Sequence, residues 1–226
     1  MRQTRETKKG EAGFSLMELM VAMCVMMLIT GAATSLLVGA FNVRSHEDQR
    51  TEAIGDARRA LNIMTRELSN SGYQLPPGLA YTSTAGSATV PVNGLLPGDC
   101  DATSITFVTN LNANITGGDK DVNDADEAIK YQFVQINGSS FLVRNDLNPP
   151  NDSLVLANRI DGMQLVYFDM DGNDVTGNVA LATSLRINLW VTINPVGREG
   201  TTGYQPASQV RLTSDVNLRN ATLGSF

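Results

Sequence analysis

The pattern of hydrophobic and polar positions changes along the chain. Residues 14–41 are apolar or small, with one charged exception, Glu18. Over residues 42–75 the pattern becomes amphipathic, with apolar residues at steps of three and four on one helical face. These apolar residues are Ile54, Ala57, Leu61, Met64 and Leu68. Short alternating runs from residue 104 onward predict β-strands.

The first two patterns predict one continuous helix from Phe14 to about Ser71. No proline interrupts this stretch, and Gly72 and Pro76 end it. Such a helix would be roughly 87 Å long at ~1.5 Å per residue, whereas a bilayer's hydrocarbon core is about 30 Å thick. We therefore predict that residues 14–41 cross a membrane and that residues 42–75 project from it, with their apolar face packed on a sheet.

The rest of the chain, residues 76–226, is predicted to be a soluble β-rich domain. Residues 76–103 are rich in Gly, Pro, Ser, Thr and Ala and are expected to form a long loop. The predicted strands are 104–110, 128–136, 139–144, 154–157, 163–168, 185–193 and 210–218. Asn137-Gly138 predicts a tight hairpin turn. One long helix followed by a mainly antiparallel sheet is an α+β fold.

The charge distribution indicates how the helix is oriented. The 226-residue chain has a net charge of −6, which argues against a general nucleic-acid binder. Its first 13 residues nevertheless concentrate basic groups, namely Arg2, Arg5, Lys8 and Lys9. Basic residues before an apolar run predict a cytoplasmic N-terminus. The domain after the helix is then expected outside the cytoplasm.

A small-residue pair, Ala12-Gly13, lies directly before the apolar run. An ordinary secretory signal has a shorter apolar core and is cut after it. Cleavage after Gly13 would instead leave the whole run on the mature chain, with residues 1–13 as the removed leader. The alternative is a membrane anchor that is not cleaved.

Glu18 favours cleavage. A carboxylate inside a membrane-spanning run costs about 2.5–3.5 kcal/mol by insertion scales, so such a group usually has a partner. A cut before Phe14 would create an amine four residues from Glu18, in the same chain or in an adjacent parallel copy. That pair would neutralise both charges and set the register between neighbouring helices.

Residues 9–23, KGEAGFSLMELMVAM, resemble the processing site of type IV pilins and type II secretion pseudopilins. The resemblance implies that a prepilin peptidase cuts between Gly13 and Phe14 and N-methylates the new terminus. It also implies that Glu18 acts in assembly and that residues 14–41 form a filament core. The apolar run of the family partly unwinds in filaments, and Gly31 is the candidate here; the alternative is small-residue helix packing.

Segments of the second half resemble PilW-type minor pilins and J-type pseudopilins. They are residues 58–61, 66–68, 72–73, 105–107, 129–131, 141–144 and 216–220. This resemblance implies a pilin-like fold and a low-copy subunit that initiates or caps a filament. The expected partners are other major and minor pilins or pseudopilins and the inner-membrane assembly platform. The expected location is the bacterial inner membrane and then the pilus or pseudopilus, with type IV pilus and type II secretion both open.

An acidic cluster suggests a metal site. Asp119, Asp121, Asn123, Asp126 and Glu127 carry oxygen ligands of the kind that calcium prefers. The sixth loop position, however, holds Asp124 where calcium loops have glycine. A shorter set, Asp169–Asp174, raises the same question. The alternative in both places is a solvated turn, and no other cofactor is expected.

No catalytic constellation is present in the sequence. The single histidine, His46, is expected on a solvated helix face, and Cys24 and Cys100 are expected to be free thiols. An enzyme is therefore not expected. The function predicted is a structural minor pilin or pseudopilin, and the alternative is a membrane-tethered extracytoplasmic binding module that does not polymerise.

Overall fold

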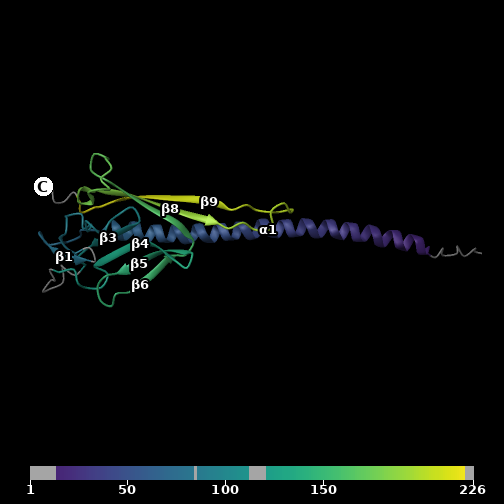
Figure 1. Ribbon diagram of the computed structural model, residues 1–226, viewed down its shortest axis with the longest axis horizontal. Helices are drawn as coiled ribbons and strands as arrows, with labels where there is room; N and C mark the ends of the chain where they lie inside the picture. The colour runs from purple at the N-terminus through teal and green to yellow at the C-terminus, as the bar shows by residue number, and fades with distance from the viewer. Residues whose placement is uncertain (1–13, 84–85, 112–120, 222–226) are drawn as a thin grey trace, which may run out of the picture. The chain divides into compact units, whose positions relative to one another are not determined.

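The computed structural model describes residues 14–83, 86–111 and 121–221. The predicted leader, with Gly13, lies outside these residues. The chain divides into two compact units. The first runs to Ser45 and includes the loop Val196–Pro206, and the second comprises His46–Pro195 and the residues from Ala207. Figure 1 colours the chain from purple near the N-terminus to yellow near the C-terminus and labels α1 and most of the strands.

One helix, α1, runs from Leu16 to Leu68, which confirms the single uninterrupted helix predicted from the pattern. The hydroxyls of Thr30 and Thr34 donate to the carbonyl oxygens of Met26 and Thr30, each at 2.8 Å, and Gly31 stays helical.

The helix ends before a crossing of two backbone segments. Gly72 adopts φ +78° and donates its amide to Val108 O at 2.9 Å. Gly94 lies so close to Gly72 that a Cβ on Gly94 would be 2.2 Å from Gly72 N. Only glycine fits this crossing, since φ at Gly94 is +73°.

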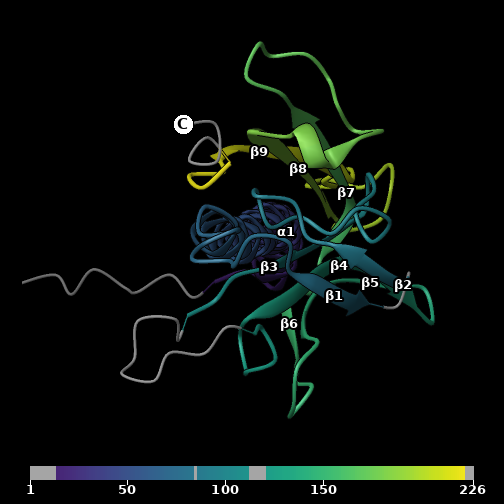
Figure 2. The ribbon, with the colours of Figure 1, turned by 90° about the vertical axis from the view of Figure 1, so that its left-hand side faces the viewer.

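The second unit holds two larger antiparallel sheets. One has the order β3-β4-β5-β6 and the other the order β7-β8-β9. Their strands are β3 Ser104–Val108, β4 Ala128–Ile136, β5 Ser139–Asp146, β6 Ser153–Ala157, β7 Ile160–Phe168, β8 Ser184–Ile193 and β9 Ser208–Asn217. In Figure 2 the part of α1 in this unit, from His46 to Leu68, lies between the two sheets. The α+β class is thus confirmed.

The turn after β4 behaves as predicted, since Asn137 and Gly138 have φ of +51° and +79°. The prediction of a loop throughout residues 76–103 is wrong. Strands β1, Ala80–Ser83, and β2, Gly86–Thr89, pair there as a small antiparallel sheet. Apart from the buried Tyr81, the residues of these strands are small and show no apolar alternation, so the sequence pattern did not predict the pairing.

The apolar face of α1 packs into the core of the second unit. Ala57, Met64 and Leu68 are fully buried, whereas Ile54 is half-buried. Ala53 and Ala60 complete the face. Burying a side chain such as Leu68 stabilises the fold by about 1.5–3 kcal/mol. The large side chains opposite are Ile105, Phe107, Ile129, Tyr131, Leu142, Leu165 and Tyr167.

Candidate functional site

The first part of α1 presents large apolar side chains to the surroundings. In the most apolar stretch of α1, 0% is buried against the rest of the chain. The exposed residues include Leu16, Met17, Leu19, Met20, Val21, Met23, Val25, Met26, Met27, Leu28, Ile29, Leu36, Leu37, Val38 and Phe41. By length and composition this helix is able to cross a membrane.

Bulk water is an unfavourable environment for this surface. Each large apolar side chain left in water forgoes about 1.5–3 kcal/mol of burial. Over the exposed set this amounts to tens of kcal/mol of burial that contact with lipid or with other helices could supply. Lipid or other apolar helices would be favourable surroundings for this part of α1.

Glu18 lies in the first turn of α1, and Phe14 precedes the helix and is 86% exposed. The Ser15 hydroxyl accepts a hydrogen bond from Met17 N at 3.3 Å, which helps to cap the helix start. A carboxylate in the first turn also interacts favourably with the helix dipole. Glu18 is four positions after Phe14 in the sequence, and Gly13, on the other side of the predicted cut, is not described.

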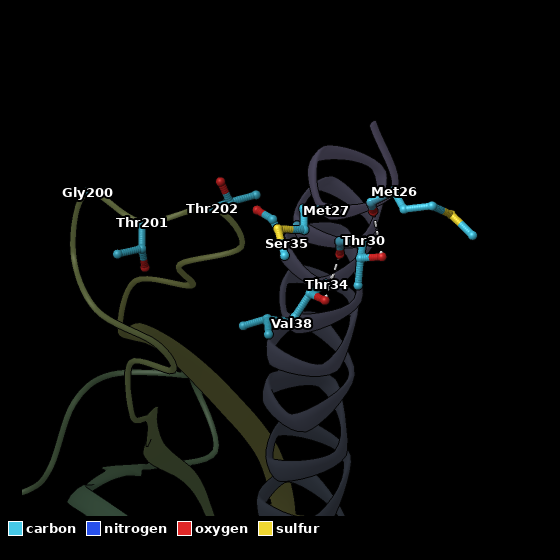
Figure 3. A pocket seen from close by; sticks show the side chains of 10 residues that line it. Met26, Met27, Thr30, Thr34, Ser35, Val38, Gly200, Thr201 and Thr202 are labelled. Atoms are coloured by element: carbon cyan, nitrogen blue, oxygen red, sulfur yellow. Dashed lines mark hydrogen bonds between the residues drawn. The ribbon is translucent and has the colours of Figure 1, made fainter. Parts of the chain in front are cut away.

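A groove of about 960 Å³ lies along α1 in the first unit. Its lining residues are Met26, Met27, Thr30, Gly31, Thr34, Ser35, Val38, Gly200, Thr201 and Thr202. Figure 3 shows Gly200, Thr201 and Thr202 on a loop beside the helix. Small residues on a helix allow another helix to approach closely in a membrane, and the bonded hydroxyls of Thr30 and Thr34 need no partner from outside.

The loop contacts α1 through glycines. Gly203 has φ +80°, and a Cβ on it would lie 2.3 Å from Gly39 Cα. Gly39 is accordingly buried within an otherwise exposed stretch. A Cβ on Gly197 would lie 2.9 Å from Asn42 Nδ2. The sequence analysis missed this contact, although the regular spacing of Gly197, Gly200 and Gly203 is a signal for it.

The predicted calcium residues are held largely by the protein itself. Glu127 is fully buried, and its carboxylate accepts the amides of Leu111 at 2.8 Å and Asp124 at 3.3 Å. Asp126 Oδ1 pairs with Arg144 Nη2 at 2.6 Å. These carboxylates therefore bond backbone and guanidinium groups of their own domain.

The remaining members of that set are spread out. Asp121 Oδ1 accepts the amide of Asn123 at 3.1 Å, and Asp119 lies outside the described residues. Across the described residues, no three His, Cys, Asp or Glu side chains gather so as to hold a metal ion. Calcium binding stays a prediction, and a calorimetric titration of the chain with calcium tests it.

The second acidic set forms a hydrogen-bonded turn. Asp169 accepts the amides of Asp171 at 2.9 Å and Asn173 at 2.8 Å, and the Asn173 side chain at 2.9 Å. The bonds from Asn173 hold the pKa of Asp169 below its usual value. For Asp169–Asp174 this geometry favours a turn over a calcium site.

His46 corrects an expectation. Only 7% of its surface is exposed, so it is not a solvated residue, and the polar residues around it in the sequence gave no sign of this burial. Cys24 and Cys100 are both free thiols, as expected.

Comparison with known proteins adds no assignment: no protein-family model matches the chain, and no curated protein matches it.

Proposed function

We propose that this chain is a prepilin-type structural subunit, a minor pilin or pseudopilin. It is cut between Gly13 and Phe14, N-methylated, held in the bacterial inner membrane by α1 and then assembled into a type IV pilus or type II secretion pseudopilus. The observation that carries the proposal is the composition of one helix. Its first part is exposed and apolar with a single acid, Glu18, while its last part is built into a folded domain.

The arrangement of the chain supports this role. A long N-terminal helix packed on antiparallel sheets is what a pilin-like fold requires. The apolar surface of α1 needs lipid before assembly and other helices after it, and the same surface serves both. Moving from lipid to neighbouring helices changes little in hydrophobic burial, so packing and polar pairs decide whether the subunit assembles.

Glu18 supplies the polar pair in this proposal. After cleavage, the amine of Phe14 in an adjacent subunit is the partner of the carboxylate. The pair offsets the cost of holding each charge in an apolar environment. It also fixes the axial register of the two helices, because the carboxylate and the terminal amine meet in only one alignment.

The test compares Glu18→Gln with Glu47→Gln, which changes an exposed acid on the same helix. Both full-length variants are expressed with the assembly machinery, and the fraction recovered in sheared filaments is measured together with the fraction in the membrane. We expect Glu18→Gln to stay in the membrane but to be nearly absent from filaments, and Glu47→Gln to assemble normally. Equal incorporation of the two variants would overturn the role of Glu18. Absence of the unchanged chain and of both variants from filaments would favour the non-polymerising binding module.

A further inference from the structure

The loop Val196–Pro206 is a preformed projection. Val196 and Gln205 exchange two backbone hydrogen bonds, each 2.9 Å long. At the tip, the amide and hydroxyl of Thr201 donate to Arg198 O at 3.0 and 2.6 Å. These bonds satisfy part of the loop's backbone internally, so it holds a defined shape next to α1.

The loop is fixed to a particular level of the helix. Gly203 meets Gly39 backbone to backbone, and the methyl group of Thr202 would be 3.6 Å from a Cβ on Gly39. Gly39 lies two residues before Phe41, the last residue of the apolar run. The contact therefore marks the end of the surface that requires an apolar environment.

The tip of the loop is charged and polar, whereas the first part of α1 is apolar. Arg198, Glu199 and Thr201 are all exposed. A charged side chain at the bilayer centre costs about 2.5–3.5 kcal/mol by insertion scales, and lipid-exposed loops do not occur within the hydrocarbon region. The helix from Leu16 to Val38 is roughly 34 Å long at ~1.5 Å per residue, close to the ~30 Å of the hydrocarbon core.

We propose that the loop Val196–Pro206 rests on the outer surface of the membrane, binds phospholipid headgroups and stops α1 from sinking deeper. Arg198 faces the lipid phosphates, and Tyr204 and Phe41 lie at the level where aromatic residues favour the interface. The inference rests on the proposed membrane anchor. It identifies phospholipid headgroups as the binding partner of this loop.

The test measures depth in the bilayer. Full-length chain carrying Cys24→Ser and Cys100→Ser is given one nitroxide label, at Thr201→Cys, Met27→Cys or Ser139→Cys, and reconstituted in phosphatidylethanolamine–phosphatidylglycerol vesicles. Power saturation with oxygen and with a water-soluble nickel chelate reports the depth of each label. We expect the Thr201 label at the phosphate level, the Met27 label in the hydrocarbon core and the Ser139 label in water.

The outcomes separate the two proposals. A Thr201 label as accessible to nickel as the Ser139 label, with the Met27 label in the core, overturns the headgroup contact alone. A Met27 label in water overturns the anchor, and the headgroup contact with it.

A second arm tests the stop. Gly203→Val forces the loop away from Gly39, whereas Gly177→Val is the control, because a Cβ there meets nothing within 4 Å. Met27 is midway between Leu16 and Val38, so Gly203→Val is expected to shift its label away from the bilayer centre and Gly177→Val to leave it in place. An unchanged depth in Gly203→Val would show that the loop does not limit insertion.

Discussion

The guanidinium of Arg144 on β5 pairs with the carboxylate of Glu67 near the end of α1, with 3.0 Å between Nε and Oε2. The Tyr131 hydroxyl donates to the same carboxylate oxygen. Burial, and then the negative charge of Glu67, raise the pKa of Tyr131, which keeps the phenol protonated and able to donate. This polar contact ties the helix to the sheet beside the apolar core.

Arg144→Met should destabilise the domain by about 3 kcal/mol, since Glu67 would lose its cation while remaining mostly buried. The measurement is urea unfolding of the detergent-solubilised chain. The matched control is Arg186→Met, because Arg186 pairs with Asp215 at 2.7 Å but both side chains are well exposed. The control should change stability little, and equal losses in the two variants would contradict this account.

The backbone crossing at Gly94 predicts a large effect from one methyl group. Gly94→Ala adds a Cβ 2.2 Å from Gly72 N, whereas Gly78→Ala adds one in open space. The two glycines have nearly the same φ, +73° and +74°, so both variants bear the left-handed strain of about 1–2 kcal/mol. Gly94→Ala should therefore melt at a clearly lower temperature than Gly78→Ala. Similar melting temperatures would argue against the crossing.

Cys100 should be unreactive in the folded chain. Burial raises the pKa of its thiol to about 12, so at pH 8 very little is thiolate, the form that reacts. In a Cys24→Ser background we expect iodoacetamide to modify Cys100 only after urea unfolding. Ser139→Cys in a chain without native cysteines gives the rate of an exposed thiol. A folded-state rate for Cys100 near that value would contradict the burial.

Sequence patterns predicted the elements that rest on local signals. The helical face from Ala57 to Leu68, the β4–β5 hairpin with its Asn137-Gly138 turn and the later strands all follow from periodicity and turn chemistry. The grouping of the strands into sheets was harder to predict from the sequence. The pattern did not show that the strands form separate sheets, because which strands pair is decided by contacts between distant residues.

The missed features share a cause. The β1–β2 hairpin, the Gly39–Gly203 contact and the burial of His46 depend on segments far apart in the sequence or on small residues without an apolar pattern. The predicted processing residue Phe14 and the predicted assembly residue Glu18 are the reverse case. Their roles are predictions from sequence alone, and the structure adds that Glu18 occupies the first turn of a helix whose apolar surface is exposed.

Mass spectrometry of the mature N-terminus tests the central claim most directly. The full-length chain is expressed with a prepilin peptidase, recovered from the membrane and analysed as an intact protein and as its N-terminal peptide. The account predicts a chain that begins at Phe14 and carries one methyl group on its amine. A chain that keeps residues 1–13, or that begins at any residue other than Phe14, would contradict it.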